Sequence, residues 1–412
     1  MRRWCMLAVV VLIFWQSRAS SQTEWPQFRG PNRDGISPDK GLLKKWPEGG
    51  PRLIWKATGL GSGYSSVAVA GGKVFSLGNT KGKTYLCAFS QKDGKKLWAT
   101  EVGPQGGNLG STPTVDGDRV YAVGQEGDLI CAKTADGELV WRVNFKRDFG
   151  GACGGWRFTE SPLIDGDKLV CTPGGKDAGI VALDKLTGKV IWKCAIPVQQ
   201  TRAGYASIMI AQQQGIKIYV QLMAAGVVGV RASDGKFLWI YDKLGRNTAN
   251  IPNPIVLGDY LFCSAGYGKG AALLKLTAQG DSVTFDEVYF NRELTNKHGG
   301  LLVVGDYVYG DRDDSGRPQC AEVKTGRIVW RKQDRGPGTG SAAMTYADGH
   351  LYVRFQNGVM ALVPATPNGY TEVSTFKIPG SRGRSWAHPV VIGGRLYLRE
   401  QDTILCYDVK AK

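Results

Sequence analysis

Hydrophobic positions along the chain fall into short runs separated by glycine turns, and one hairpin pattern recurs eight times. Each copy has an apolar strand, a turn containing glycine that usually has Asp or a second Gly beside it, and a second strand in which Val or Leu mostly stands next to an aromatic residue. Short runs joined by such turns are typical of β-hairpins. The copies span residues 67–78, 114–124, 163–174, 209–220, 255–266, 302–310, 345–354 and 391–400.

A second hairpin follows most copies. It is marked by an Asp-Gly or Thr-Gly dipeptide and by a tryptophan four residues after the glycine. Five copies carry it, at Trp98, Trp141, Trp192, Trp239 and Trp330, and in two copies the corresponding segment leads to Phe285 or Phe376 instead. A large ring at a fixed place on an outer strand fits packing between neighbouring sheets, so we assign these tryptophans to the core.

The spacing of the hairpins predicts the architecture. From Gly72 to Gly394 the turn glycines recur every 43 to 49 residues, and four strands per unit of this length is the period of β-propeller blades. The last copy ends at residues 404–408 without a Trp strand, whereas residues 52–56 form a Trp strand with no hairpin before it. Pairing the two ends would complete an eighth blade and remove the open sheet edges.

We therefore predict an all-β fold, an eight-bladed β-propeller of four-stranded antiparallel blades closed by its N- and C-terminal strands. The propeller domain covers residues 52–412, and residues 20–51 form an N-terminal lead-in segment. We also expect the chain to be a monomer.

The first residues have the pattern of a secretory signal. A basic start, Met1 to Arg3, precedes an apolar run from Cys5 to Trp15, and small residues follow at 17–19. The run is shorter than the ~20 residues that cross a bilayer as a helix. The sequence therefore predicts a signal peptide at residues 1–19, a periplasmic or secreted protein, and no transmembrane span after cleavage.

Composition and charge narrow the class of protein. The chain has 412 residues, of which 57 are glycine and 42% are hydrophobic, which argues against both a disordered chain and a helical bundle. The formal net charge of +16 falls to +13 without residues 1–19, and the basic residues are scattered. Since no nucleic-acid-binding motif is present, we expect no nucleic acid partner and only weak attraction to anionic surfaces.

Cysteine usage does not indicate a disulfide framework. Cys87, Cys131, Cys320 and Cys406 occupy one position of the repeat, so they should lie on different blades. A disulfide needs Cα atoms within ~7 Å of each other. We therefore expect four reduced thiols that are buried as small apolar side chains.

The repeat also resembles a known family. Residues 182–192, Ala-Leu-Asp-Lys-Leu-Thr-Gly-Lys-Val-Ile-Trp, are similar to the repeat of pyrroloquinoline-quinone (PQQ)-like eight-bladed propellers. Residues 25–35 resemble the lead-in of exported members from Planctomycetes-type bacteria. The family includes quinoprotein alcohol dehydrogenases and outer-membrane assembly scaffolds, so the resemblance implies the fold and leaves the function open between these classes.

The first hypothesis is an exported, non-catalytic binding or scaffold module that holds a protein, peptide or polysaccharide at the mouth of the central channel. The alternative is a PQQ- and Ca²⁺-dependent alcohol or sugar dehydrogenase, which needs oxygen ligands for calcium and a carboxylate base. Glu160 and Asn253 have the right chemistry for two such ligands. The resemblance also implies an adjacent Cys-Cys pair, which this chain lacks, and Lys297 and His298 stand where a base would be sought. We therefore favour the binding module and assign no catalytic residue and no cofactor.

Residues just before each inner strand should ring the mouth of the channel, where functional groups concentrate on rigid scaffolds. Five side chains in the longer connections, at positions 156, 157, 202, 384 and 386, could form an aromatic and cationic pocket for an anionic or sugar-like ligand. The favoured alternative is that they cover blade edges. The full candidate ligand or partner face is Tyr64, Trp156, Arg157, Glu160, Arg202, Tyr205, Asn253, His298, Arg384, Trp386 and His388.

Two further patterns suggest metal sites. His298 and His388 both precede inner strands, but they lie two blades apart, so we favour structural histidines over a metal pair. The spacing of Asp311, Asp313, Ser315 and Glu322 matches a calcium-binding EF-hand loop. Because both flanks are predicted strands, we interpret this segment as a solvated acidic loop and not as a metal site.

Overall fold

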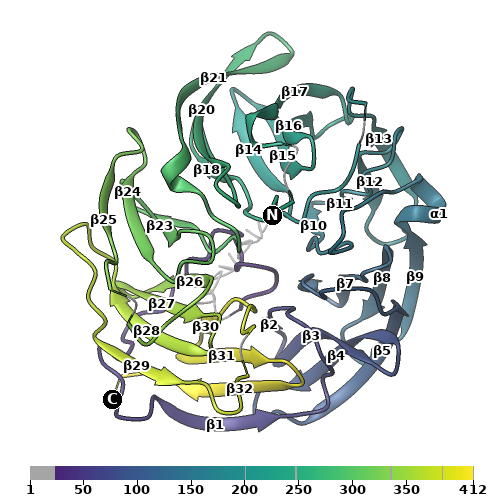
Figure 1. Cartoon of the computed structure of the whole chain (residues 1–412). Coiled ribbons are helices and arrows are strands. Elements are labelled where there is room, and N and C mark those ends of the chain that lie inside the picture. Colours follow the sequence, from purple (N-terminus) through teal and green to yellow (C-terminus); the bar gives the residue numbers. More distant parts are fainter. Residues whose placement is uncertain (1–23, 200, 246–247, 335, 383, 412) are drawn as a thin grey trace, which may run out of the picture.

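The computed structural model describes residues 24–199, 201–245, 248–334, 336–382 and 384–411. It confirms the predicted architecture, with eight four-stranded antiparallel sheets arranged around a central axis (Figure 1). The predicted signal peptide lies outside the described residues. Among the described residues, no helix is long and apolar enough to cross a membrane.

The first four blades, numbered in chain order and listed from the inner to the outer strand, follow the repeat directly. Blade 1 contains β2 (Ala68–Ala70), β3 (Lys73–Thr80), β4 (Lys83–Ser90) and β5 (Lys96–Pro104); blade 2 contains β6 (Thr114–Asp116), β7 (Arg119–Val123), β8 (Asp128–Lys133) and β9 (Leu139–Asn144), with helix α1 (Phe145–Phe149) after it; blade 3 contains β10 (Leu163–Asp165), β11 (Lys168–Cys171), β12 (Ile180–Asp184) and β13 (Val190–Cys194); blade 4 contains β14 (Met209–Gln213), β15 (Ile216–Met223), β16 (Gly226–Arg231) and β17 (Phe237–Tyr241), then the 3₁₀ turn Asp242–Leu244.

The second half repeats this order until the chain ends meet. Blade 5 contains β18 (Ile255–Leu257), β19 (Tyr260–Ala265), β20 (Gly270–Gln279) and β21 (Ser282–Asn291), then the 3₁₀ turn Arg292–Leu294; blade 6 contains β22 (Leu302–Val304), β23 (Tyr307–Asp311), β24 (Pro318–Glu322) and β25 (Ile328–Arg331); blade 7 contains β26 (Ala342–Ala347), β27 (His350–Phe355), β28 (Val359–Pro364) and β29 (Ser374–Lys377); blade 8 contains β30 (Val390–Ile392), β31 (Arg395–Glu400), β32 (Thr403–Asp408) and, as its outer strand, β1 (Arg52–Ala57).

The two ends of the chain close the ring as predicted. Strand β1 pairs antiparallel with β32, and Trp55 lies opposite Cys406. The buried guanidinium of Arg399 in blade 8 reaches blade 1, where it donates to the backbone carbonyl of Leu77 in β3 at 2.5 Å. It also donates to the carbonyls of Gly61 at 3.0 Å and Ser65 at 3.2 Å in the connection before β2. The closure therefore combines a strand pairing with a buried side chain that joins the last blade to the first.

The repeat tryptophans connect neighbouring blades. The indole of Trp98 in blade 1 donates to the carbonyl of Thr134 in blade 2, and Trp141 in blade 2 donates to Lys185 in blade 3. The glycine of the next blade's outer turn lies beneath the ring. A Cβ atom at Gly137, which has φ 78°, would lie 2.6 Å from Cε3 of Trp98. The Gly-to-Trp spacing in the sequence thus marks a contact between blades.

Blade 5 departs from the sequence interpretation, because Tyr289 and not Phe285 takes the tryptophan position. Tyr289 lies opposite Leu273 next to a bulge, and its hydroxyl donates at 2.8 Å to the carbonyl of Val323 in blade 6. Phe285 packs against Trp239 of blade 4 instead. The strands of this outer hairpin are ten residues long, so counting four residues from Gly280 stops short of the packing position.

The four repeat cysteines, Cys87, Cys131, Cys320 and Cys406, are buried free thiols, as expected from their equivalent positions. Burial raises the pKa of Cys131 to about 11 and that of Cys406 to about 12. These thiols are protonated at neutral pH and pack as small apolar groups.

The lead-in segment crosses the centre of the propeller (Figure 1, purple). Trp25 pairs with Val69 of blade 1, and Ile36 forms a bridge with Tyr346 of blade 7. Between them, two buried arginines donate to backbone carbonyls on opposite sides of the ring. Arg29 donates to Gly299 before blade 6 at 3.0 Å, and Arg33 donates to Ser161 before blade 3 at 2.8 Å. Residues 42–50 then run over blades 7 and 8, where the backbone N–H of Trp46 donates to Ser374 Oγ at 3.0 Å. We call residues 24–36 the plug, since they cross the central channel.

Candidate functional site

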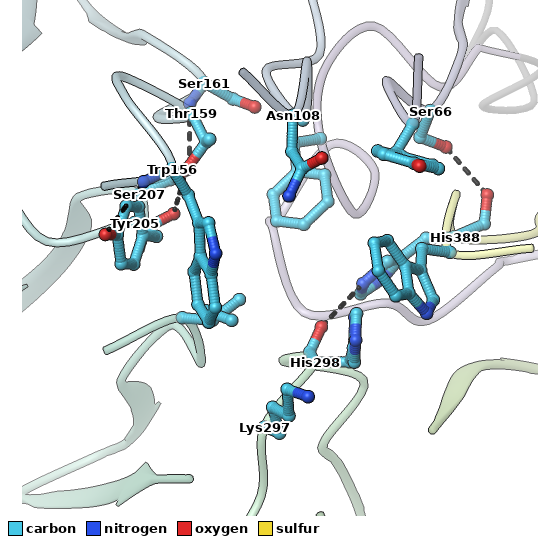
Figure 2. A pocket seen from close by; sticks show the side chains of 15 residues that line it. Ser66, Asn108, Trp156, Thr159, Ser161, Tyr205, Ser207, Lys297, His298 and His388 are labelled. Carbon is cyan, nitrogen blue, oxygen red and sulfur yellow. Dashed lines mark hydrogen bonds between the residues drawn. The ribbon is translucent and has the colours of Figure 1, made fainter. Parts of the chain in front are cut away.

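The mouth of the channel, where the chain enters the inner strands, holds a cavity of about 160 Å³ (Figure 2). Its walls come from the connections that precede the inner strands of several blades, and the plug adds one aromatic ring. We call it the mouth pocket. It is lined by Phe28, Tyr64, Ser66, Asn108, Gly110, Trp156, Thr159, Ser161, Tyr205, Ser207, Ile251, Lys297, His298, Trp386 and His388.

The structure brings together six of the eleven candidate face residues in this lining: Tyr64, Trp156, Tyr205, His298, Trp386 and His388. The other five lie elsewhere. Arg157 is half-exposed and pairs with Glu126 at 3.4 Å, Arg202 is exposed, and the guanidinium of Arg384 lies 5.8 Å from the ring centre of Trp386. Glu160 and Asn253 are buried next to the pocket.

Sequence reasoning missed Phe28, Asn108, Thr159 and Ile251. Phe28 belongs to the plug, and an aromatic residue in the Trp-Pro-Gln-Phe start of that segment was an available signal. The other three lie in connections whose length differs from blade to blade, so the repeat alignment could not place them.

A chain of hydrogen bonds between blades fixes one side of the mouth. The backbone N–H of Thr112 donates to Ser161 Oγ at 2.9 Å, Ser161 N–H donates to Ser207 Oγ at 3.0 Å, and Ser207 N–H donates to Asn253 Oδ1 at 2.8 Å. Each residue thus holds the corresponding residue of the next blade. Ser66 begins the series by donating to Thr112 Oγ1 at 3.1 Å. The series spans blades 1 to 5 and gives the pocket a rigid polar rim.

Glu160 and Asn253, the two candidate calcium ligands, take part in the hydrogen bonds around the pocket. Glu160 is 3% exposed, and its carboxylate accepts the backbone N–H of Thr172 at 2.7 Å and the Thr172 hydroxyl at 3.0 Å. Burial raises the pKa of Glu160 to about 8, against the pull of these hydrogen bonds and of Arg33. The amide oxygen of Asn253 completes the series of inter-blade hydrogen bonds, so neither oxygen donor faces the cavity.

Among the residues that the structure describes, no Asp or Glu lines the mouth pocket, and no group of three or more His, Cys, Asp or Glu side chains could hold a metal ion. A PQQ enzyme needs oxygen ligands for Ca²⁺ and a carboxylate base beside the quinone. The residues around this cavity do not fit that requirement.

Aromatic rings form the walls of the mouth pocket. Trp156 packs against Tyr205 with ring centres 5.1 Å apart, and the Trp156 backbone N–H donates to the Tyr205 hydroxyl at 3.3 Å. On another wall, Trp386 packs between Tyr64 at 4.7 Å and His298 at 5.0 Å. Figure 2 shows Trp156 and His388 on opposite sides of the cavity. The pocket therefore offers flat apolar surfaces on two sides.

The two histidines are neutral and joined to each other. His388 Nε2 lies 3.1 Å from the backbone carbonyl of His298, and because a carbonyl only accepts, Nε2 carries the proton and Nδ1 is an acceptor. Burial lowers the pKa of His298 to about 4, and burial together with the positive charge of Arg29 lowers that of His388 to about 3. His388 is thus held by a backbone partner, which fits a structural histidine. Among the described residues, its Nδ1 atom is buried without a hydrogen-bond partner.

The acidic segment before β24 is not the solvated loop that we expected. Asp311 ends strand β23 with 1% of its surface exposed, and its carboxylate accepts the backbone N–H of Ala342 at 3.2 Å. Burial raises the pKa of Asp311 well above the usual range. Among residues 311–316, only Asp314 and Ser315 are exposed, and the Asp314 side chain is 45% exposed. The prediction of a solvated loop is therefore wrong for Asp311, because strand β23 includes this residue and buries its side chain.

The other EF-hand positions also have partners within the protein. Asp313 accepts the backbone N–H groups of Tyr267 at 3.1 Å and Gly268 at 2.9 Å, so it ties this loop to blade 5. Glu322 forms an ion pair with Arg327 at the next turn. The spacing of oxygen donors resembles a calcium loop, but the donors stabilise turns and blade contacts.

Fold and site define a class of protein, an eight-bladed propeller with a plug across its central channel and, beside the plug, an aromatic pocket whose described lining has no carboxylate. The family model described as outer membrane protein assembly factor BamB matches residues 82–332, more than half of the chain. The chain belongs to this family of PQQ-like β-propellers.

Curated relatives have different functions. The outer membrane protein assembly factor BamB of Kangiella koreensis is 31% identical over 138 residues, which is 31% of this chain and 31% of the relative. The tetrathionate hydrolase of Acidithiobacillus ferrooxidans is 24% identical over 385 residues, covering 79% of this chain and 69% of the relative. The first match thus spans about a third of the relative's length.

Solved structures share the fold at low sequence identity. BamB from Moraxella catarrhalis superposes with a TM-score of 0.62 and 16% identity, over 87% of this chain and 98% of that chain. A europium-containing methanol dehydrogenase has a TM-score of 0.67 and 12% identity, over 92% and 89% of the two chains. The same fold thus occurs in an assembly factor and in a dehydrogenase, so the site must decide between these functions.

Proposed function

We propose that the protein is an exported, non-catalytic binding or scaffold module of the cell envelope that engages its partner at the mouth pocket. The observation that carries this proposal is the lining of the pocket. It combines aromatic walls with hydroxyl and amide groups and has no carboxylate. A pocket with apolar walls and a few fixed polar groups suits recognition of a ligand.

The framework around the pocket supports binding over oxidation. Glu160 and Asn253, the candidate calcium ligands, are buried and hydrogen-bonded to Thr172 and Ser207. The assembly-factor relatives favour a scaffold that works with a protein, and the chemistry of the pocket also admits a peptide or a polysaccharide. A periplasmic or secreted location and a monomeric state remain part of the proposal.

The proposal is tested by placing a photo-crosslinking amino acid at position 108, in the mouth pocket, and at position 32, in the plug, in separate variants expressed in cells. We expect a crosslinked envelope component from position 108 and none from position 32. Equal labelling from both positions would contradict binding at the mouth.

The dehydrogenase alternative is tested by titrating the purified protein with PQQ and Ca²⁺ and then assaying dye-linked oxidation of alcohols and sugars. We expect no stoichiometric binding and no turnover. Stoichiometric PQQ binding, with a turnover that is lost in Glu160→Gln, would overturn the proposal.

A further inference from the structure

Resting on the proposed binding role of the mouth pocket, we infer that this pocket holds one neutral pyranose ring of a glycan. Four properties of the described residues carry this inference: the size of the cavity, its aromatic walls, its hydrogen-bonding groups and its charge.

The size of the cavity suits the insertion of one ring. Its volume is about 160 Å³, and a cavity of about 150 Å³ holds a benzene molecule. A longer chain would therefore insert one residue and leave the remainder over the rim. This geometry suits a sugar residue of an oligosaccharide or polysaccharide, which can enter while its neighbours stay in solvent.

The aromatic walls suit the flat face of a sugar. The axial C–H groups of a pyranose form an apolar face that packs on indole or phenol rings, because the ring face carries partial negative charge. Trp156 presents its ring to the cavity and is supported from behind by Tyr205, with ring centres 5.1 Å apart. Trp386 is held between Tyr64 and His298. Both indoles are thus fixed before a ligand arrives, which lowers the entropic cost of binding.

The polar groups of the pocket require a ligand that both donates and accepts. The hydroxyl oxygens of Ser161 and Ser207 accept backbone N–H groups, so each hydroxyl proton remains to be donated. Asn108, which also lines the cavity, offers both kinds of group. Sugar hydroxyls satisfy such a set. A phenyl side chain of a peptide would leave these groups unpaired when it displaced water, which is costly.

The charge of the pocket favours a neutral ligand. Lys297 is the one residue with a formal charge in the described part of the lining, and it forms an ion pair with Asp314. Both histidines are neutral at pH 7. An ammonium ligand would meet Lys297 without a carboxylate in the described lining to offset its charge. An anionic ring would find its nearest cation already paired.

The test is isothermal titration calorimetry of the purified protein with three neutral probes, cellotetraose, maltotetraose and the N-acetylglucosamine tetramer. Trigalacturonic acid and a phenylalanine-containing tetrapeptide serve as comparisons. We expect saturable binding of at least one neutral tetrasaccharide and at least tenfold weaker binding of the two comparison ligands.

Variants locate the binding. Trp156→Ala should weaken the best neutral probe at least tenfold, whereas Trp156→Phe, which keeps an aromatic face, should stay within about threefold of wild type. Asn108→Ala should weaken binding severalfold, and its matched control Asn32→Ala, an exposed amide in the plug, should not. Thermal unfolding of each variant shows that the effect is not a loss of the fold.

Absence of binding by all three neutral probes, tighter binding of the tetrapeptide or of the acidic trimer, or unchanged affinity in a folded Trp156→Ala would overturn the inference. The proposed function fails separately. If position 108 still crosslinks to an envelope component while no sugar binds, the mouth is a partner site of other chemistry. If position 108 also gives no crosslink, both proposals fall.

Discussion

His388 donates through Nε2 to the backbone carbonyl of His298, 3.1 Å away, and so joins the connection before blade 8 to the connection before blade 6. This hydrogen bond leaves Nδ1 of His388 as an acceptor that is buried and has no partner among the described residues. Burial makes the charged forms of both imidazoles unfavourable, so the stability of this region depends on pH.

Acid should therefore destabilise the fold through these histidines. Their pKa values are lowered in the folded state to about 4 and about 3, while an unfolded histidine titrates near 6.5. Their contribution to stability is complete above pH 6.5 and is lost as the pH falls toward 4. We expect the free energy of unfolding to fall by about 2 kcal/mol per histidine between pH 7 and pH 5.

The histidine prediction is measured by urea unfolding at several pH values. His388→Gln should show a weaker dependence on acid than wild type, whereas His350→Gln, which changes the histidine outside the pocket, should keep the slope. Equal slopes for wild type and His388→Gln would contradict the assignment.

Glu160 should make the free energy of unfolding depend on pH in the opposite direction. Burial raises its folded pKa from 4.5 to about 8, so the folded state holds the proton more tightly than the unfolded chain. The stability that results is present below pH 4.5 and is lost as the pH rises toward 8. Glu160→Gln keeps a hydrogen-bonding side chain without the charge, and we expect it to be more stable than wild type at pH 8 by roughly 2 to 4 kcal/mol. A difference that stays constant from pH 5 to pH 8 would argue against a protonated Glu160.

Closure of the ring should depend on Arg399. Its buried guanidinium donates to the carbonyls of Gly61 and Ser65, and its removal leaves these groups without their donor. We expect Arg399→Ala to lower the free energy of unfolding by about 3 kcal/mol. Arg52→Ala, which removes an exposed ion pair with Asp408 in the same closure, should cost less than about 1 kcal/mol. Similar losses of unfolding free energy in both variants would contradict a special role of Arg399 in closing the ring.

The contact between blades at the outer turns should make some glycines far more sensitive than others. Gly137 has φ 78° and lies under the ring of Trp98, whereas Gly117 has φ 57° with no atom within 4 Å of an added Cβ. Gly117→Ala should cost about 1 kcal/mol from backbone strain alone. We expect Gly137→Ala to cost about 2 to 4 kcal/mol, since a clash is added. Thermal unfolding compares the two, and equal costs would remove the packing argument.

The sequence predicts the blades well because each blade repeats one local pattern. The glycine turns and the Gly-to-Trp spacing report contacts that recur around the ring, and the unpaired strand of Trp55 predicts the closure. The pattern fails where blade 5 lengthens its outer hairpin, because Tyr289 then takes the packing position at a different distance from Gly280.

The site could be predicted only in part, since a pocket joins residues that no repeat relates. Position before an inner strand is enough to place Tyr64, Tyr205 and His388 at the mouth. Phe28 arrives through the plug, whose path across the channel is set by the buried contacts of Arg29 and Arg33. Such contacts lie far apart in the sequence and leave no periodic signal.

The most direct test of the account is a crystal structure of the protein grown with the neutral tetrasaccharide that binds best. We expect one sugar ring in the mouth pocket, packed on Trp156, with a hydroxyl within hydrogen-bonding distance of the Asn108 amide. An empty pocket with the sugar bound elsewhere, or PQQ with Ca²⁺ in the pocket after co-crystallisation with both, would contradict it.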